Sequence, residues 1–377
     1  MRILFTGGGT GGHFYPIIAI ADEIKNITKE KRLLEPELFY MSPTPYNAGL
    51  LFEKDIAYKK NSAGKLRRYF SILNFFDLFK TAWGILGSLY EVYKIYPDVI
   101  FGKGGYGSFP TLVAARILRI PVVIHESDTK PGKVNLWAGK FAEKIAISYP
   151  EAAEYFPKEK VAHTGNPVRK DLTVPISEGA REYLKLEEGV PVILVLGGSQ
   201  GAESINDILL EGLPELVKKY SIIHQTGKNN IAESKSTSEA VLINSEHKDR
   251  YKPFDYLNPL AMRMAAGVAD VVVSRAGSTI FEIAAWGTPS IIIPIPESVS
   301  HDQRSNAFAY ARSGAGEVIE EQNLTASILA SEIDRLVNNP VERERMKQAA
   351  KAFYKPTAAH EIAEEILKIA LSHEIES

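Results

Sequence analysis

Three glycine-rich segments have the composition of loops that bind phosphate groups. They are residues 7–13 (GGGTGGH), 102–108 (GKGGYGS) and 197–202 (GGSQGA), and each directly follows a predicted strand. Glycine lets backbone N–H groups approach a phosphate closely, at the positive end of the helix that follows. A tight strand-to-helix turn can have the same sequence, so one such segment alone is weak evidence.

Four side chains next to such loops could do chemistry or bind a nucleotide. The imidazole of His13 could accept a hydroxyl proton near neutral pH, although a lone histidine is more often structural. Ser278 or Thr279 could cap the helix that follows strand 270–274, leaving its N–H groups to face a diphosphate. Glu282, about one turn further along, is placed to accept hydrogen bonds from a ribose diol, although a helix glutamate alone is usually just solvated.

Two common nucleotide motifs and a metal site are disfavoured. Gly7, Gly9 and Gly12 fit the G-x-G-x-x-G fingerprint, but the next strand ends in residues 39–43 (FYMSP) without the acid that holds a ribose. No P-loop sequence is present. There is no Asp-x-Asp pair, and the eight histidines lack ligand spacing, so we expect neither a metal nor another cofactor.

The amino-acid composition excludes several other kinds of partner and site. The 377 residues include 44 Lys and Arg against 46 Asp and Glu, which argues against a nucleic-acid partner. The absence of cysteine excludes disulfides, a thiolate zinc site and a cysteine nucleophile. No apolar stretch is long enough for a membrane span or a signal peptide, so we expect a soluble or peripheral protein inside the cell.

Short apolar strands alternate with helical patterns along nearly the whole chain. The apolar runs lack a period of two, as expected for parallel strands covered on both faces. The sequence therefore predicts an α/β protein with two Rossmann-like, doubly wound parallel-sheet domains, at 1–165 and 166–355. A helix within 356–377 is expected to cross back onto the first domain. The predicted strands are 2–6, 37–41, 98–102, 121–125, 144–148, 160–163, 190–196, 220–225, 240–244, 270–274 and 290–294.

Eight motifs in this order resemble the MurG family of bacterial cell-wall glycosyltransferases. They are GGGTGGH (7–13), GGYGSFP (104–110), HESD (125–128), TGNPVR (164–169), GGSQGA (197–202), HQTGK (224–228), SRAGSTIFE (274–282) and HDQRSNA (301–307). The resemblance covers nearly the whole chain. It implies a GT-B fold, with two Rossmann-like domains separated by a cleft, and no metal requirement. It also implies inverting transfer of GlcNAc from UDP-GlcNAc to the C4 hydroxyl of the muramoyl sugar of undecaprenyl-linked lipid I, giving lipid II for peptidoglycan.

The resemblance also assigns roles by motif position. Glu282 would hold the uridine ribose and the backbone of Leu257 would face uracil, although Asn258-Pro259 blurs the alignment there. Residues at the donor phosphates and sugar would be Arg169, Ser199, Ser278 and Thr279. Those at the GlcNAc hydroxyls would be Asp128, where many members have Asn, and Gln303. Those near the acceptor diphosphate would be Thr10, Gly11, Gly12, Gly104, Gly105, Tyr106 and Ser108, with His13 as the general base.

The segment 57–86 suits a membrane surface. It combines basic residues with many large apolar ones, a composition that favours an anionic leaflet. An ordinary core helix beside a solvated basic loop is the alternative, but the apolar residues exceed one helix face. We therefore expect peripheral attachment to the cytoplasmic side of the cell membrane. The basic residues are Lys59, Lys60, Lys65, Arg67 and Arg68, and the apolar ones are Tyr69, Phe70, Ile72, Leu73, Phe75, Phe76, Leu78, Phe79, Trp83, Ile85 and Leu86.

Two other functions fit the same motifs. One is a different UDP-sugar enzyme of the GT-B class, either a glycolipid synthase or a UDP-GlcNAc 2-epimerase. The other is a sugar-nucleotide-binding scaffold without catalysis. An epimerase needs no lipid-facing surface, and a scaffold has no need of His13, Glu282 and Gln303 together, so the transferase is preferred.

Overall fold

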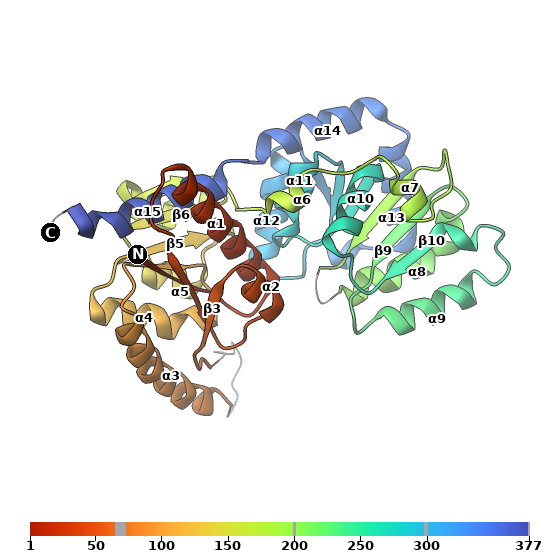
Figure 1. Ribbon diagram of the computed structural model, residues 1–377. Coiled ribbons are helices and arrows are strands. Elements are labelled where there is room, and N and C mark those ends of the chain that lie inside the picture. Colours follow the sequence, from red (N-terminus) through yellow and green to blue (C-terminus); the bar gives the residue numbers. More distant parts are fainter. Residues whose placement is uncertain (65–72, 199–200, 298–300, 376–377) are drawn as a thin grey trace. The chain divides into compact units, whose positions relative to one another are not determined.

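The computed structural model describes residues 1–64, 73–198, 201–297 and 301–375, and the chain divides into two units (Figure 1). Unit 1 contains residues 1–169 and 356–377, and unit 2 contains residues 170–355. Arg169, which the sequence-based division assigned to the second domain, therefore belongs to unit 1. Each unit is described below by itself.

Unit 1 is built on a seven-stranded parallel sheet with strand order β3-β2-β1-β4-β5-β6-β7. This is the doubly wound order, in which the direction of winding reverses between β1 and β4. The strands are β1 (Arg2–Thr6), β2 (Glu37–Ser42), β3 (Ile56–Lys60), β4 (Val99–Gly102), β5 (Val122–Glu126), β6 (Lys144–Ile147) and β7 (Val161–His163).

Helices cover both faces of this sheet. Successive residues of β1 point to opposite faces: Ile3 and Phe5 pack with α1 and α15, whereas Leu4 packs with α3, α4 and α5. The C-terminal helix α15 therefore lies against α1, the first helix of the chain. The helices of unit 1 are α1 (Gly11–Glu30), α2 (Ala48–Glu53), α3 (Leu73–Ile95), η1 (Tyr106–Ser108), α4 (Phe109–Leu118), α5 (Lys133–Ala138), η2 (Pro150–Tyr155), η3 (Lys158–Lys160) and α15 (Ala358–Ile375).

Unit 2 repeats the design with a six-stranded parallel sheet of order β10-β9-β8-β11-β12-β13. Its winding reverses between β8 and β11. The strands are β8 (Val192–Leu196), β9 (Ser221–Gln225), β10 (Tyr251–Phe254), β11 (Val271–Ser274), β12 (Ser290–Ile292) and β13 (Gly316–Val318).

Two hydrophobic cores lie on the two faces of the unit 2 sheet. Leu194 packs with α10, α11 and α12, whereas Ile193 and Val195 pack with α8 and α13. The helices of unit 2 are α6 (Lys170–Thr173), α7 (Ala180–Tyr183), α8 (Glu203–Leu216), α9 (Ile231–Val241), η4 (Lys248–Arg250), α10 (Pro259–Val268), α11 (Thr279–Trp286), α12 (His301–Arg312), η5 (Glu321–Asn323), α13 (Ala326–Val337) and α14 (Pro340–Phe353).

One predicted strand is wrong and three strands were missed. Residues 240–244 form the end of α9 and a turn, and Ile243 is 77% exposed, so this apolar run does not enter the sheet. The missed strands are β3, β10 and β13, which all form sheet edges. Pro253 in β10 and the lysines of β3 are tolerated there because an edge strand pairs on one side only.

Candidate functional site

Two glycine loops of unit 1 lie against each other at the carboxyl ends of β1 and β4. A Cβ atom built on Gly105 would lie 2.9 Å from the Cα of Gly8 and 3.3 Å from Nε2 of His13. Gly105 also has φ of +78°, a conformation that L side chains rarely adopt. Only glycine therefore fits at this contact, which brings the predicted general base and the predicted diphosphate loop together.

His13 is held at the start of α1 with its imidazole in the neutral form. Its Nδ1 lies 2.8 Å from the hydroxyl oxygen of Thr10, the N-cap residue of α1. Burial, together with the positive charge of Lys103, lowers the pKa of His13 to about 4. When Nδ1–H donates to Thr10, Nε2 is the atom that can accept a proton. The side chain is therefore ready to act as a base, although its intrinsic basicity is low.

The other predicted acceptor-side residues surround this contact. The hydroxyl of Ser108 donates to the backbone oxygen of Gly105, at 2.8 Å, and so holds the loop before α4. A Cβ on Gly9 would lie 3.8 Å from the hydroxyl of Tyr106, and one on Gly11 would lie 2.7 Å from the hydroxyl of Tyr46. Four further residues belong to the same two loops, namely Thr10, Gly11, Gly12 and Gly104.

Asp128 and Arg169, two residues predicted to contact the donor, also lie in unit 1. Asp128 is half-buried after β5, and its backbone N–H donates to the Glu126 carboxylate at 3.0 Å. The guanidinium of Arg169 lies 4.4 Å from the ring centre of Tyr15, two residues beyond His13 on α1. Arg169 thus lies against the first turns of α1, close to His13 in sequence, whereas Asp128 lies in the loop after β5.

In unit 2, the predicted donor residues follow the carboxyl ends of the strands. Leu257 follows β10, Ser278 and Thr279 lie at the start of α11 after β11, and Glu282 is in the first turn of that helix. Ser278 occupies the N-cap position but makes no side-chain cap to the described backbone of α11, so the predicted capping by this residue is wrong. The carboxyl edge of a parallel sheet is where open α/β proteins bind ligands. Ser199 lies outside the described residues.

Gln225, at the end of β9, was not predicted as a site residue. Its side-chain oxygen accepts a hydrogen bond from the backbone N–H of Leu257 at 3.0 Å, and its amide nitrogen donates to the backbone oxygen of Gly198 at 3.3 Å. Gln225 thereby ties the predicted uracil-facing backbone to the glycine loop after β8. In the sequence, only the position of Gln225 within the HQTGK motif indicated that it could belong to the site.

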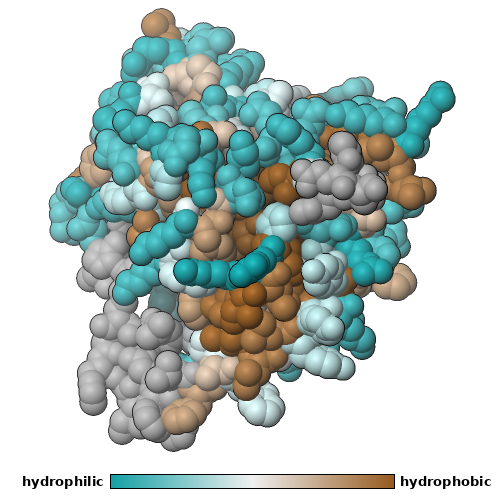
Figure 2. Space-filling model, turned by 90° about the vertical axis from the view of Figure 1, so that its left-hand side faces the viewer, coloured by the Kyte–Doolittle hydropathy of each residue, from teal (hydrophilic) through white to brown (hydrophobic). Residues whose placement is uncertain are grey.

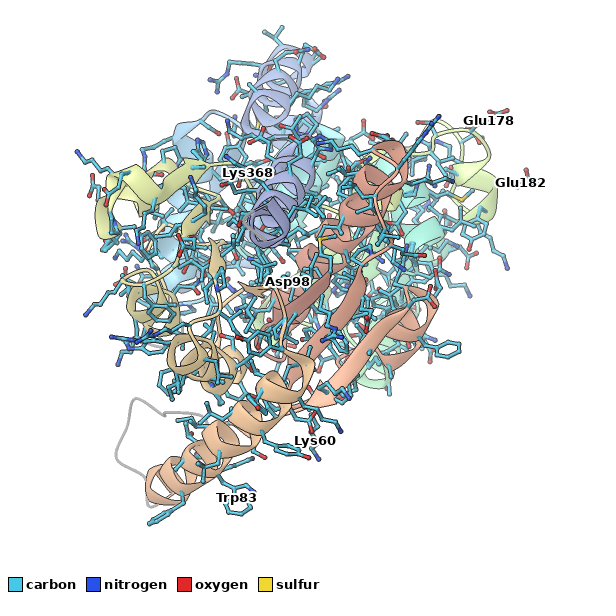
Figure 3. All side chains as sticks on the ribbon, turned by 60° about the vertical axis from the view of Figure 1, so that its left-hand side comes forward. Lys60, Trp83, Asp98, Glu178, Glu182 and Lys368 are labelled. Atoms are coloured by element: carbon cyan, nitrogen blue, oxygen red, sulfur yellow. The ribbon has the colours of Figure 1, made fainter. Side chains whose placement is uncertain are left out.

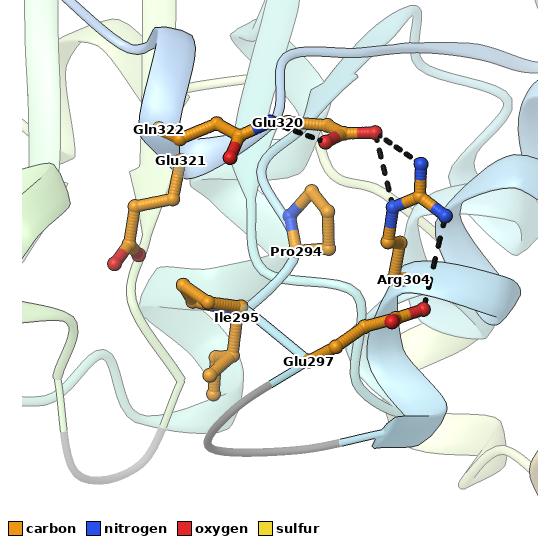
Figure 4. A pocket seen from close by; sticks show the side chains of 8 residues that line it. Pro294, Ile295, Glu297, Arg304, Glu320, Glu321 and Gln322 are labelled. Carbon is orange, nitrogen blue, oxygen red and sulfur yellow. Dashed lines mark hydrogen bonds and ion pairs between the residues drawn. The ribbon is translucent and has the colours of Figure 1, made fainter.

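A pocket of about 300 Å³ lies at the carboxyl end of β12 (Figure 4). The Gln303 side-chain oxygen accepts a hydrogen bond from the backbone N–H of Ile295, at 3.4 Å, and Ile295 lines the pocket. Arg304 crosses the pocket to Glu320, at 2.7 Å, and lies 3.7 Å from Glu297. The wall thus combines these charged side chains with the apolar residues Pro294, Ile295 and Pro296. Within the described ranges, no three His, Asp or Glu side chains converge as a metal site.

Comparisons with known proteins place these features in a wider group. The glycosyltransferase family 28 N-terminal domain matches residues 3–147, and the C-terminal domain of the same family matches residues 192–363. A protein of Bacillus thuringiensis subsp. konkukian is 36% identical over 355 residues, 93% of this chain and 95% of that protein. A protein of Treponema denticola is 35% identical over 371 residues, 93% of this chain and 92% of the relative. Both relatives are named UDP-N-acetylglucosamine–N-acetylmuramyl-(pentapeptide) pyrophosphoryl-undecaprenol N-acetylglucosamine transferase, numbered 2 in the Bacillus protein.

Solved structures share the fold at lower identity. Acinetobacter baumannii MurG matches with a TM-score of 0.72 and 23% identity, over 97% of this chain and 99% of that chain. A putative UDP-N-acetylglucosamine 2-epimerase from Listeria monocytogenes also has a TM-score of 0.72, at 17% identity, over 100% of this chain and 97% of that chain. The fold is therefore GT-B, and this fold alone does not separate transferases from epimerases.

Proposed function

The chain belongs to the MurG family of glycosyltransferases, and from this premise we propose that it transfers GlcNAc from UDP-GlcNAc to lipid I, forming lipid II. The observation that carries the proposal is the close approach of His13 to the loop that contains Gly105. The chain in which this occurs is about 36% identical to named transferases over nearly its full length. The base and a loop suited to the acceptor diphosphate thus belong to one site.

The reaction is a single displacement with inversion. Nε2 of His13 takes the proton of the C4 hydroxyl while that oxygen forms a bond to the anomeric carbon of GlcNAc. The bond from the anomeric carbon to the UDP oxygen breaks, and UDP leaves with the electron pair. In unit 1, backbone N–H groups of the two glycine loops and the start of α1 hold the acceptor diphosphate.

Unit 2 binds the donor in this proposal. Glu282 accepts hydrogen bonds from the ribose diol, and the backbone of Leu257 faces uracil. The start of α11, with Ser278 and Thr279, faces the diphosphate, and Gln303 contacts a hydroxyl of the sugar. For Arg169 and Asp128, which belong to unit 1, a role at the donor sugar and phosphates stays a prediction from the motifs. No metal takes part, because N–H groups and helix N-termini stabilise the leaving diphosphate.

The epimerase alternative is weaker. Structures of 2-epimerases share the fold at 17% identity or less, whereas curated relatives near 36% identity are named transferases. An epimerase would also need no surface for a lipid-linked acceptor.

The deciding experiment measures UDP release from UDP-GlcNAc in EDTA, with and without a soluble lipid I analogue. Release that depends on the analogue and survives chelation supports a metal-independent transferase. Release without acceptor would contradict an acceptor-dependent transferase. Conversion of UDP-GlcNAc into its C2 epimer, with UDP still attached, would point to the epimerase. Tight UDP-GlcNAc binding without release would point to a different acceptor or a scaffold.

The outer face of α3 supports attachment to a membrane surface. Its large apolar residues at positions 79, 83, 86, 90 and 93 are all exposed, and the spacing of three and four residues places them on one side of the helix. The opposite side of α3 is buried and has smaller residues, such as Gly84, Ser88 and Val92. None of the helices in the described ranges is long and apolar enough to cross a membrane.

Positive charge lies beside this stripe. Lys60 ends β3 next to α3, and Lys59 pairs with Glu91 of α3 at 3.9 Å. Figure 3 shows Trp83 projecting from α3 away from the rest of unit 1, and Figure 2 shows a hydrophobic patch on the face of this unit turned to the viewer. The predicted cations Lys65, Arg67 and Arg68 and the apolar residues 69–72 lie outside the described residues, as do the side chains of Leu73, Phe75, Phe76 and Leu78.

We expect the stripe to dock the protein on the cytoplasmic leaflet. Replacing Trp83, Leu86 and Tyr90 with Ser should abolish sedimentation with vesicles containing anionic lipid, while turnover of a short-chain acceptor remains. Phe52→Ser is the matched control, because Phe52 is 86% exposed on α2, outside the stripe. Undiminished vesicle binding by the folded triple variant would contradict the docking role.

A further inference from the structure

Lys103 is a buried cation at the carboxyl end of β4, directly before the Gly104–Gly105 turn. It is 1% exposed, and its backbone N–H donates to the backbone oxygen of Thr6 at 2.9 Å. Its ammonium donates a short hydrogen bond to the hydroxyl of Ser127. A buried ammonium is strongly unfavourable unless hydrogen bonds and opposite charges compensate it. The burial of Lys103 therefore requires compensating partners.

Two carboxyl groups provide the opposite charge, Glu126 at the end of β5 and Asp128 just after it. Burial and the Asp128 charge raise the pKa of Glu126 to about 7, so Asp128 is the partner that is fully ionised at neutral pH. Burial lowers the pKa of Lys103 to about 8, and the charges of Glu126 and Asp128 oppose this shift, so the ammonium is charged below pH 8. Glu126 also closes the loop after β5, since its two oxygens accept hydrogen bonds from the backbone N–H groups of Asp128 and Gly132, at 3.0 and 3.1 Å. Asn135 donates to the same carboxylate at 2.9 Å. The carboxyl of Glu126 therefore has a structural role as well as a charge.

The residues after Lys103 connect this cluster to the imidazole of His13. A Cβ on Gly104 would meet the side-chain amide of Asn135 at 2.8 Å, and one on Gly105 would lie 3.3 Å from Nε2 of His13. Three consecutive residues thus touch the loop after β5, the start of α5 and the base. A fixed positive charge at this position disfavours a second positive charge on the nearby imidazole.

We propose that Lys103 is a positioning residue for glycosyl transfer: its ammonium holds the loop after β5 against the glycine loops, and its charge adds to the effect of burial on the His13 imidazole. The proposal rests on the proposed function, in which His13 is the base. The titratable groups that act on one another in this cluster are His13 in α1, Lys103 after β4, and His125, Glu126 and Asp128 on and after β5.

Lys103→Met tests the charge, since methionine keeps most of the side-chain length. The titration of His13 is followed by NMR in the full-length protein, with its resonance assigned by its loss in His13→Ala. We expect His13 of the Lys103→Met variant to titrate at a pH about 1 unit higher than in the unmodified chain. The acid limb of kcat/KM should move by the same amount.

Three outcomes are distinguishable. Matching shifts in the NMR titration and in the rate profile support the proposal. No shift in either overturns it, and Lys103 is then structural while the transferase assignment stands. An NMR shift without a change in the rate profile also overturns it, because His13 is then not the base.

A second variant covers the case in which Lys103→Met does not fold. Lys103→Met combined with Asp128→Asn removes one cation and one carboxylate, so the net charge of the cluster is kept. We expect this double variant to regain the thermal midpoint and His13 to titrate close to its value in the unmodified chain, because loss of the cation and loss of the carboxylate shift the imidazole in opposite directions. A double variant that folds but in which His13 titrates clearly lower would overturn the charge role, because only the carboxylate would then act on the imidazole.

Discussion

The charge of His13 sets the pH range in which this side chain can act as a base. Its pKa is lowered to about 4 by burial and by the Lys103 charge, so the imidazole is neutral at every pH well above 4. A group with a lowered pKa loses its proton-accepting form only when the pH falls through that lower value. We therefore expect kcat/KM to stay flat from pH 8 to about pH 5, as far as His13 is concerned. A fall in kcat/KM at low pH with a midpoint near pH 6.5, measured with a soluble acceptor, would contradict the lowered pKa of His13.

The carboxylate of Glu282 should matter for donor affinity and not for the basic step. A hydrogen bond to a charged group contributes about 1.5–3 kcal/mol, so Glu282→Ala should weaken UDP binding by roughly 10- to 100-fold. Calorimetric titration with UDP measures this directly. Glu233→Ala in the first turn of α9 is the control and should leave the dissociation constant unchanged. Equal affinity in the two variants would remove Glu282 from the donor site.

Sequence analysis identified the glycine loops and His13 but not the polar side chains that support them. Lys103, Glu126 and Gln225 are buried, whereas a charged or amide residue in a sequence is usually exposed. Their partners are also remote in sequence, as with Gln225 and Leu257. No local sequence pattern indicates such a pair, because the two residues meet only in the folded protein.

At the scale of an element, the turn between β4 and α4 depends on glycine at position 105. Gly105→Ala places a Cβ 2.9 Å from the Cα of Gly8 and forces an L residue into φ of +78°. With ψ of 161°, this conformation is essentially restricted to glycine and costs another residue about 1–3 kcal/mol. The contact must also push the two glycine loops apart. We expect a lower thermal midpoint and a loss of transfer of at least about tenfold.

Gly132→Ala is the matched control for this turn. Gly132 precedes α5 in the same unit, has φ of −65°, and no atom lies within 4 Å of its added Cβ among the residues described. Its thermal midpoint and turnover should be close to those of the unmodified chain. Similar effects of the two substitutions would mean that the close approach of the loops is not what activity needs.

Strands could be predicted where they lie in the middle of a sheet. The run 192–196 is apolar at every position because both faces of β8 are covered, and this pattern is hard to mistake. The edge strand β10 carries Pro253 and polar neighbours, so its sequence resembles a loop. The run 240–244 has the composition of a strand, but it ends α9 at the surface, and the edge of the sheet is occupied by β10.

At the scale of the whole chain, unit 1 is completed by its most distant part. Ile362 and Ile366 of α15 pack in the same core as Ile3 and Ile17. Removing residues 356–377 should therefore expose apolar surface on α1 and destabilise unit 1, whereas the cores of unit 2 contain none of these residues. Thermal unfolding followed by fluorescence would show this as a lower midpoint for Trp137 of unit 1. An unchanged Trp137 midpoint would contradict the role of α15.

The distribution of tryptophan allows donor binding to be assigned to one unit. Trp137 lies in unit 1, and Trp286 lies in unit 2, where its indole N–H donates to the backbone oxygen of Leu172 at 2.7 Å. A ligand at 100 times its dissociation constant stabilises the fold that binds it by about 2.7 kcal/mol. We expect UDP to raise the unfolding midpoint reported by Trp286, in a variant with the other two tryptophans replaced by Phe. The matched variant that keeps only Trp137 should show a smaller rise or none, since the predicted nucleoside contacts Leu257 and Glu282 belong to unit 2. A rise reported by Trp137 alone would contradict the assignment of the nucleotide to unit 2.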